Sequence, residues 1–286
     1  MTLKPLYMWA GGKNKLIKHY EPIFSQLPHY DNYVEPFFGG GSIYCWLKNH
    51  NKFETASIND IKPEIMGIYE SIKQDGDKFL STVNTELNNY FTHSDKDSRK
   101  AYYYDLRQQY WDNPTPEMLF VLMRLGFNGI WQTCTASKGL FGTPAGLLNH
   151  KTKEQIVSPE ILKKWEESLQ TTDLSSVSYE HMDIRPENTL IYLDPPYRDS
   201  FTTYGTGFND EDQKRLVEWS LAQADKGATV LLANRFVEGD TFFENLLPNA
   251  SFTYFDVFYT AGRRKKVETG YEAKKAREFL AVLNPH

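Results

Sequence analysis

The chain has 286 residues and a formal net charge of −5, and this length suits one α/β domain or a domain with a large insertion. No run approaches the roughly 18 apolar residues of a membrane span, and the N-terminus lacks the apolar core of a signal peptide. The two cysteines, Cys45 and Cys134, provide neither a disulfide framework nor a zinc site. The sequence therefore predicts a cytoplasmic protein and excludes the membrane-spanning and disulfide-rich secreted classes.

An aromatic residue, small residues and a cation open the chain at residues 7–13, and residues 14–25 have the apolar spacing of a short amphipathic helix. Lys13 is expected near the start of this helix, where backbone N–H groups favour an anion. The segment is not a P-loop, because the four-residue spacer between glycines is absent and Asn14 replaces the Ser or Thr after the lysine. A nucleoside triphosphatase is therefore not expected.

Residues 33–38 predict a strand that ends at Pro36 or lies at an edge. A glycine turn at 39–41 follows, and then a helix for which Ser42 is the expected N-cap. A second strand, residues 55–60, ends in Asp60, about twenty residues after the glycines, where an acid commonly bonds ribose hydroxyls. This combination indicates a bound adenosine moiety.

The middle of the chain predicts packed helices over residues 62–125, from their apolar spacing. Residues 126–150 are rich in glycine, aromatics and small polar residues without helical period, and such a long loop in a compact domain is usually functional. Residues 151–170 predict a further helix.

Residues 189–193 form an apolar run of strand length, and Asp194-Pro195-Pro196-Tyr197 follows it. The prolines fix φ and remove two N–H donors, so the strand must stop there while its carbonyls remain acceptors. The Asp194 carboxylate and the Pro195 carbonyl suit the two N–H bonds of an aromatic amine, and Tyr197 suits stacking on its ring. An ordinary strand-to-loop turn is the alternative reading of this tetrapeptide.

The end of the chain predicts a helix at 209–225, a buried strand at 228–233 and a helix at 242–247. Residues 251–259 and 278–283 predict a closing β pair. Between them, residues 263–277 carry seven Lys and Arg against two Glu, so charge is segregated within an acidic protein. This segment is either a phosphate-contacting footprint or a solvated loop face.

With these residues in view, the chain resembles the Dam-type (D12 class) DNA adenine-N6 methyltransferases. The resemblance rests on residues in the family order: Trp9–Lys13, Val34–Gly41, Asp60, Asn128-Gly129, Asp194–Tyr197 and Arg264–Lys266. It implies an α/β, Rossmann-like S-adenosylmethionine-dependent methyltransferase fold with an inserted, mainly helical DNA-recognition domain. The expected catalytic domain spans residues 1–61 and 174–286, and the inserted domain spans 62–173. The resemblance also implies S-adenosylmethionine as donor, adenine N6 in double-stranded DNA as acceptor, base flipping and no metal.

The resemblance assigns a role to each matching position. The expected catalytic residues are Asp194, Pro195, Pro196 and Tyr197. The expected cofactor-binding residues are Trp9, Lys13, Phe37, Gly39, Asp60, Asp183 and Asp194. The expected DNA-binding residues are Asn128, Gln132, Lys138, Arg264, Lys265 and Lys266.

Two positions depart from the GATC-reading members of this family, which carry a lysine where this chain has Met8 and an arginine where it has Gln132. Lys and Arg read guanine through its major-groove acceptors, whereas methionine cannot and glutamine pairs better with adenine. We therefore expect a recognition sequence other than GATC, or relaxed specificity, with Lys138 as a candidate substitute contact.

Other acceptors suit the same tetrapeptide: adenine in RNA, cytosine N4 or a protein amide. A nucleic-acid-binding protein whose methylase fold has lost activity is a further alternative. One subunit acting on one adenine predicts a monomer, or a dimer on DNA, in a bacterial or phage-infected cell. Roles as a restriction partner, in phage self-protection and in strand marking all use this chemistry.

Overall fold

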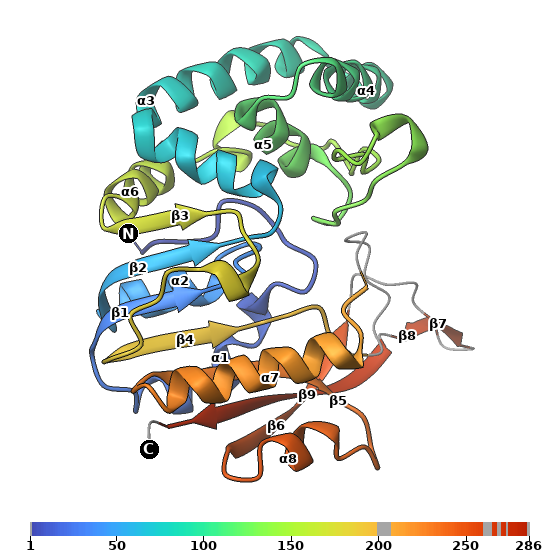
Figure 1. Ribbon diagram of the computed structural model, residues 1–286. Coiled ribbons are helices and arrows are strands. Elements are labelled where there is room, and N and C mark those ends of the chain that lie inside the picture. Colours follow the sequence, from blue (N-terminus) through green and yellow to red (C-terminus); the bar gives the residue numbers. More distant parts are fainter. Residues whose placement is uncertain (1, 199–206, 260–264, 268–269, 273, 285–286) are drawn as a thin grey trace. The chain divides into compact units, whose positions relative to one another are not determined.

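The computed structural model describes residues 2–198, 207–259, 265–267, 270–272 and 274–284 (Figure 1). The chain divides into two compact units. The first comprises Met1–Asn14, Gly39–His50 and Asp60–Ser176, and the second comprises Lys15–Phe38, Asn51–Asn59 and Val177–His286. The expected boundaries place residues 1–14 and 39–50 in the catalytic domain, whereas the structure groups them with the helical segment.

In its described residues, the second unit contains most of the β-structure and three α-helices. Its strands are β1 (Tyr30–Glu35), β2 (Phe53–Asn59), β4 (Thr189–Leu193), β5 (Thr229–Phe236), β6 (Ser251–Tyr259), β7 (Lys265–Val267), β8 (Gly270–Glu272) and β9 (Lys274–Leu283). Its α-helices are α1 (Ile17–Phe24), α7 (Asp210–Ala224) and α8 (Phe242–Leu246), and it has a 3-10 turn, η4 (Tyr179–His181).

Six of the seven strands of the main sheet belong to this unit, in the order β2-β1-β4-β5-β9-β6. Strands β2, β1, β4 and β5 run parallel, whereas β9 pairs antiparallel with both β5 and β6. β7 and β8 form a separate antiparallel pair. The parallel order, with its reversal between β1 and β4, is that of a Rossmann-like fold. The predicted α/β class is therefore confirmed, as is the closing pair of β6 and β9.

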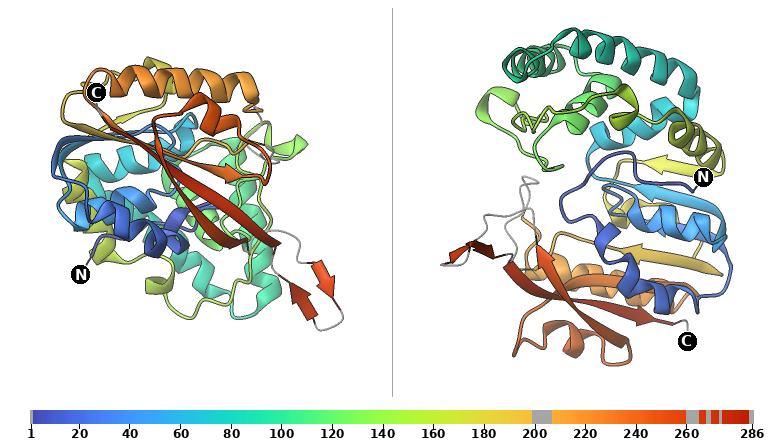
Figure 2. Two further views of the ribbon diagram at one scale, coloured as in Figure 1. Left: turned by 90° about the horizontal axis from the view of Figure 1, so that it is seen from below. Right: turned by 180° about the vertical axis from the view of Figure 1, so that it is seen from behind.

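Helices α7 and α1 lie on opposite faces of this sheet (Figure 2). On one face, Leu216 of α7 packs in a core that includes Ile191 and Leu193 of β4. On the other face, Tyr20 of α1 meets Phe255 of β6 with ring centroids 5.3 Å apart. All five residues of β4 are buried, as expected for a parallel strand that is covered on both sides. Full burial of each large apolar side chain contributes about 1.5–3 kcal/mol.

The first unit is mainly helical. It contains α2 (Ser42–Asn49), α3 (Pro63–Thr92), α4 (Lys96–Asp112), α5 (Pro116–Leu125), α6 (Pro159–Leu169), the short strand β3 (Thr172–Ser175) and the 3-10 turns η2 (Thr135–Ser137) and η3 (Lys153–Gln155). Another 3-10 turn, η1 (Lys13–Lys15), crosses the boundary between the units. Trp165 of α6 anchors the packing, since it stacks on Tyr44 of α2 and donates from Nε1 to the Lys4 carbonyl at 2.8 Å.

Two expected helix starts in this unit were wrong. The helix expected from residue 151 begins only at Pro159, because Ser158 caps it and proline fits the first helical position, where no N–H partner exists. The expected N-cap Ser42 is instead the first helical residue of α2, and Gly41 occupies the cap with φ of +65°. A left-handed φ suits glycine because it has no Cβ.

Candidate active site

The acidic tetrapeptide predicted at residues 194–197 follows β4 directly, at the carboxyl edge of the parallel strands. The strand order reverses between β1 and β4, and ligands of open α/β sheets bind at such a reversal. Pro195 is buried, and Asp194, Pro196 and Tyr197 are partly buried. The structure thus brings the four expected catalytic residues together at the edge of the sheet where a substrate would enter.

Two buried amide side chains hold the backbone on either side of Tyr197. Gln213 of α7 donates from Nε2 to the Pro196 carbonyl at 2.9 Å, and Asn234 of β5 donates from Nδ2 to Gln213 Oε1 at 3.2 Å. The Asn234 Oδ1 accepts from the Arg198 backbone N–H at 3.2 Å. Both amides are 0% exposed, so their polar atoms must find partners inside the protein. This chain of hydrogen bonds, here called the amide relay, fixes the tetrapeptide backbone.

The Tyr197 ring is held separately through its hydroxyl, which donates to Glu278 Oε2 of β9 at 2.5 Å. Glu278 is only 2% exposed. Burial raises the pKa of the Tyr197 hydroxyl well above its usual range, and the charges of Asp194 and Glu278 act in the same direction. The hydroxyl therefore stays protonated and remains a donor at neutral pH, which keeps the orientation of the ring fixed.

Arg198, the next residue, ties this corner to two further elements. Its guanidinium donates to both carboxylate oxygens of Asp210 at the start of α7, at 2.7 and 3.0 Å, and it also pairs with Asp240. The guanidinium lies 4.3 Å from the centre of the Phe242 ring. Bidentate pairing with a carboxylate is the strong geometry for arginine, so Arg198 is held firmly next to the tetrapeptide.

In the first unit, Trp9 packs against the glycine turn that begins at Gly39. A Cβ added to Gly39 would lie 2.5 Å from Trp9 Nε1, and one added to Gly40 would lie 2.8 Å from Trp9 Cβ. Asp60 is 9% exposed and accepts from the Gly39 N–H at 2.9 Å and from the Lys62 N–H at 3.0 Å. Burial raises the pKa of the Asp60 carboxyl, and these two hydrogen bonds oppose the rise. Three of the expected cofactor residues are thus neighbours here.

Lys13 is buried, with 4% exposed, and donates from Nζ to the Gly11 carbonyl at 3.0 Å. It lies in the 3-10 turn that precedes α1, and not at the first turn of α1 itself. Its side chain folds back on the preceding glycine turn, so its ammonium group lies beside the backbone of the Trp9–Lys13 motif.

The remaining expected cofactor residues, Phe37 and Asp183, belong to the second unit. The Phe37 ring packs on Tyr179 and Phe208, with ring centroids 5.6 and 6.1 Å apart. Asp183 is exposed in the segment between η4 and β4. Their roles toward a cofactor stay predictions.

The loop of residues 126–150 exposes three of the expected DNA-binding residues: Asn128, Gln132 and Lys138. Asn128 and Lys138 have positive φ, +54° and +50°, which only a few per cent of non-glycine residues adopt. The loop also pairs with the N-terminal motif, because the Ala10 N–H donates to the Gly129 carbonyl at 2.9 Å. In this way the Trp9 motif and the Asn-Gly pair are joined backbone to backbone.

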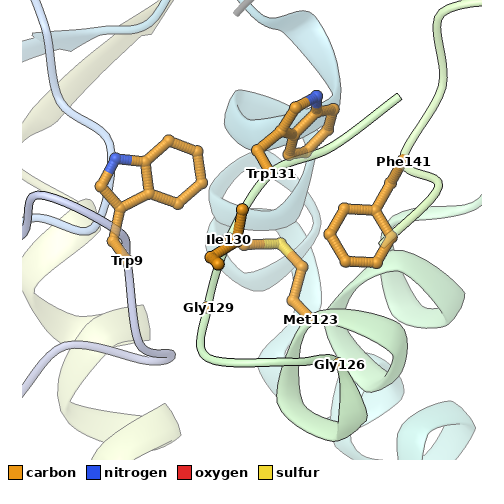
Figure 3. Close-up of a pocket in the computed structure, with 7 residues that line it drawn as sticks. All are labelled: Trp9, Met123, Gly126, Gly129, Ile130, Trp131 and Phe141. Carbon is orange, nitrogen blue, oxygen red and sulfur yellow. The ribbon is translucent and has the colours of Figure 1, made fainter. Parts of the chain in front are cut away.

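A small apolar pocket lies where these two segments meet (Figure 3). Trp9, Ile130, Trp131 and Phe141 surround it, with Met123 at its base. The Trp9 and Trp131 rings lie 6.4 Å apart, and the Trp131 and Phe141 rings meet edge-on at 5.4 Å. The loop is therefore packed on the unit through Trp131 and Phe141, while Asn128, Gln132 and Lys138 are exposed.

The basic segment is described only in part. Arg264 lies outside the described residues, and for Lys265 and Lys266 the structure gives the backbone of β7 alone. Their expected contacts with DNA stay predictions. Among the described residues, no group of three or more His, Cys, Asp or Glu could hold a metal ion. Within that same part of the chain, no helix is long and apolar enough to cross a membrane.

The sequence did not single out Gln213, Asn234, Glu278 or Glu35. Glu35 ends β1, is 3% exposed and accepts from the Tyr33 hydroxyl at 2.7 Å. One signal was available for Asn234, because it follows an apolar strand run just as Asp60 and Asp194 do. For Gln213 the signal was a polar residue on the apolar face of its helix.

The strand order defines the class of the fold, a Rossmann-like α/β fold with the tetrapeptide at the carboxyl edge of its parallel strands. A family model described as D12 class N6 adenine-specific DNA methyltransferase matches residues 9–261. Since this match spans most of the chain, the protein belongs to that family and is an adenine-specific DNA methyltransferase. The family and enzyme class expected from the sequence are confirmed.

Individual relatives agree with this assignment. The chain is 28% identical to the type II methyltransferase M.MjaIII of Methanocaldococcus jannaschii, over 82% of this chain and 86% of the relative. It is also 28% identical to the DNA adenine methylase of Vibrio cholerae, over 97% and 95%, and 26% identical to that of Escherichia coli K12, over 97% and 94%. Among solved structures, a precorrin 8W decarboxylase of Methanobacterium thermoautotrophicum matches at a TM-score of 0.39 and 8% identity, over 94% of this chain and 89% of that one.

Proposed function

We propose that this enzyme transfers a methyl group from S-adenosylmethionine to N6 of an adenine that it flips out of double-stranded DNA. The observation that carries the proposal is the rigid Asp194–Tyr197 corner. Its backbone is held by the amide relay and its tyrosine ring by Glu278. Alignment of donor and acceptor is the main contribution that such a site makes to a displacement reaction.

The residues of the first unit fit a nucleoside cofactor. The Gly39 turn brings backbone close to the Trp9 indole, where a Cβ would clash, and a Cβ on Gly11 would meet nothing within 4 Å. Backbone without side chains permits the close approach that nucleotide-like ligands need. In the proposal, Asp60 binds the ribose hydroxyls, Trp9, Lys13, Phe37 and Gly39 line the site, and Asp183 meets the adenine edge. When bound, the cofactor supplies an electrophilic methyl group on sulfonium.

At the target, Asp194 and the Pro195 carbonyl accept the two N–H bonds of the exocyclic amine. This pairing would draw the nitrogen lone pair out of conjugation with the ring. N6 could then bond to the methyl carbon as the carbon–sulfur bond breaks and its electron pair stays on sulfur, and Asp194 would accept the proton that N6 loses. Tyr197 stacks on the base. Extrusion of a paired adenine costs a few kcal/mol, and these contacts offset that cost. One subunit suffices, so we propose a monomer, or a dimer on DNA.

The recognition sequence is proposed to differ from GATC or to be relaxed. Met8 is 64% exposed, and its backbone is close to Gly129, where an added Cβ would lie 2.4 Å from the Met8 carbonyl oxygen. Met8 and Gln132 therefore flank the Asn-Gly pair without the cations that read guanine. Sequencing of methylated bases in treated DNA tests this proposal, and modification confined to GATC would refute it.

A tritium-transfer assay on duplex DNA, RNA and bulk protein tests the acceptor. We expect label in duplex DNA, recovered as N6-methyladenine after digestion. Label in RNA, in cytosine or in protein would instead support the corresponding alternative acceptor. No transfer, together with no cofactor binding by calorimetry, would indicate a methylase fold that only binds DNA.

A further inference from the structure

Helix α4 carries four hydrogen-bond donors at every fourth position: Arg99, Tyr103, Arg107 and Trp111. Residues four apart lie on one face of a helix, so these side chains form a row, here called the donor stripe. All four donate to backbone carbonyls, and each of the four reaches the second half of the loop 126–150. None of these four residues has a role in the methyl transfer proposed above.

The stripe binds the loop in reverse order along the chain. Trp111 donates from Nε1 to the Phe141 carbonyl at 2.9 Å, and Arg107 donates from Nη1 to the carbonyls of Gly142 and Thr143 at 2.8 and 3.2 Å. The Tyr103 hydroxyl donates to the Thr143 carbonyl at 2.8 Å. At the other end of the stripe, Arg99 donates from Nη1 to the carbonyls of residues 148 and 150, at 3.1 and 2.8 Å.

The donors are themselves held in place. The Arg107 guanidinium lies between the rings of Tyr104 and Trp111, 4.6 and 4.7 Å from their centres, a favourable cation–π geometry. Burial raises the pKa of the Tyr103 hydroxyl, so it stays protonated and keeps its donor. At the start of α4, Asp95 caps the helix by accepting from two backbone N–H groups.

Tyr103, Arg107 and Trp111 bind carbonyls of residues 141–143, here called the inner leg of the loop. Hydrogen bonds join this inner leg to the part of the loop that carries Gln132. Residues 141–143 are buried, and buried carbonyls need partners. Thr143 Oγ1 accepts from the Gln132 N–H at 3.1 Å and donates to the Ile130 carbonyl at 2.6 Å, and the Gly142 N–H donates to the Gln132 carbonyl at 2.7 Å. The backbone of Gln132 is therefore set by the leg that α4 holds.

We propose that the donor stripe of α4 positions the loop 126–150 for sequence recognition, so that α4 governs which site is methylated without touching DNA itself. This inference rests on the proposed function in assigning the loop to DNA. The stripe residues are positioning residues. Their loss releases the inner leg of the loop and lets the Gln132 backbone shift. The loop then discriminates less well between DNA sequences, while the Asp194–Tyr197 corner of the second unit is unchanged.

The experiment compares Arg107→Met and Tyr103→Phe with a matched control, Tyr102→Phe. Tyr102 is the neighbouring residue of the same helix, and its hydroxyl donates to Glu86 of α3 at 2.8 Å rather than to the loop. Each tyrosine variant loses one hydroxyl. We expect Arg107→Met and Tyr103→Phe to raise the KM for duplex DNA at least about fivefold, as one lost hydrogen bond allows, and to broaden the set of methylated sequences. The affinity for S-adenosylmethionine and kcat should stay within about twofold of wild type in these variants.

Two further readouts separate positioning from general loss of structure. Arg107→Lys retains a cation and a donor, so it should restore part of the wild-type site preference. Hydrogen exchange of the amides in residues 127–146 should quicken in Arg107→Met and stay as in wild type in Tyr102→Phe.

Unchanged exchange in the loop of Arg107→Met, or an unchanged KM and site spectrum, would overturn the inference. Equal effects of Tyr102→Phe and Tyr103→Phe would overturn it as well. If the wild type methylates no adenine in duplex DNA, the proposed function fails, and with it the role in recognition. The exchange comparison still judges whether the stripe positions the loop.

Discussion

Asp60 combines a buried carboxyl with two backbone hydrogen bonds, and the balance between them sets how its charge affects stability. Burial raises the pKa of this carboxyl, and the N–H groups of Lys62 and Gly39 oppose that rise. A raised pKa means that the folded protein holds the proton more tightly than the unfolded chain does. The stabilisation from Asp60 is therefore complete below its ordinary pKa, about 3.9, and is lost as the pH rises through the raised value.

The variant Asp60→Asn tests whether Asp60 stabilises the folded protein more at low pH than at neutral pH. An asparagine stays neutral at every pH, so the variant does not undergo that loss. We expect its free energy of unfolding, measured relative to wild type with urea, to be higher at pH 7 than at pH 4. A relative stability that is the same at both pH values, or that falls toward pH 7, would show that hydrogen bonding outweighs burial. In the proposed function the same change weakens cofactor binding, because it removes a charged acceptor.

At the scale of elements, the tetrapeptide depends on α7 and β5 as much as on the strand that carries it. Gln213→Leu should remove the hydrogen bonds that Gln213 makes to the Pro196 carbonyl and to Asn234 Nδ2 in the interior, at a cost of about 1–3 kcal/mol in stability. Because the backbone beside Tyr197 is then released, we expect kcat to fall about tenfold or more, with a smaller change in the affinity for the cofactor.

Ser220→Ala is the matched control for this prediction. Ser220 is buried in the same helix, and its hydroxyl donates to the Leu216 carbonyl at 2.7 Å, away from the tetrapeptide. Its loss should cost about 1 kcal/mol and leave kcat unchanged. Chemical denaturation and steady-state kinetics measure both quantities. Equal falls in kcat for the two variants would mean that general destabilisation, and not the amide relay, explains the effect.

The sequence predicted those elements whose signals are local. The apolar run before Asp194 fits β4, Thr189–Leu193, and the polar Asn209 fits the N-cap of α7, whose side chain accepts from two backbone N–H groups. The start of α6 at Pro159 was missed because the expected helix was extended back to residue 151, past the cap Ser158. In such a case the cap and the proline are the better guide.

The amide relay could not be predicted, because it joins residues 196, 213 and 234, which meet only when β4, β5 and α7 pack together. The same holds for Tyr197 and Glu278, 81 positions apart. Register between β5 and β9, which places Glu278 opposite Arg235, has no local signature. The sequence therefore located the residues of the tetrapeptide, but not the side chains of Gln213, Asn234 and Glu278 that hold them in place.

At the scale of the whole molecule, an acidic chain must bind a polyanion. The net charge is −5, yet residues 263–277 are strongly basic, and Lys265 and Lys266 lie in β7. We expect Lys265→Ala and Lys266→Ala each to weaken binding to all duplex sequences alike. Each should also lower the slope of log affinity against log salt by about 0.9, as for one lost phosphate contact.

Lys226→Ala is the control, because Lys226 is exposed just before β5, at the opposite edge of the parallel strands from Asp194. Its salt slope should equal that of wild type. Fluorescence titrations of labelled duplexes at several salt concentrations provide the slopes. A loss restricted to one sequence would mean that Lys265 or Lys266 reads bases, contrary to the prediction.

The proposed function requires that Asp194 take part in methyl transfer to adenine in DNA. Its most direct test is single-molecule sequencing of plasmid DNA from cells that express either the wild type or Asp194→Ala, at matched levels of folded protein. We predict N6-methyladenine at a defined set of sites with the wild type and at least about 100-fold less with the variant, as for removal of one preorganised group at a reacting centre. Unmodified adenine in both plasmids, or equal methylation in both, would contradict the account.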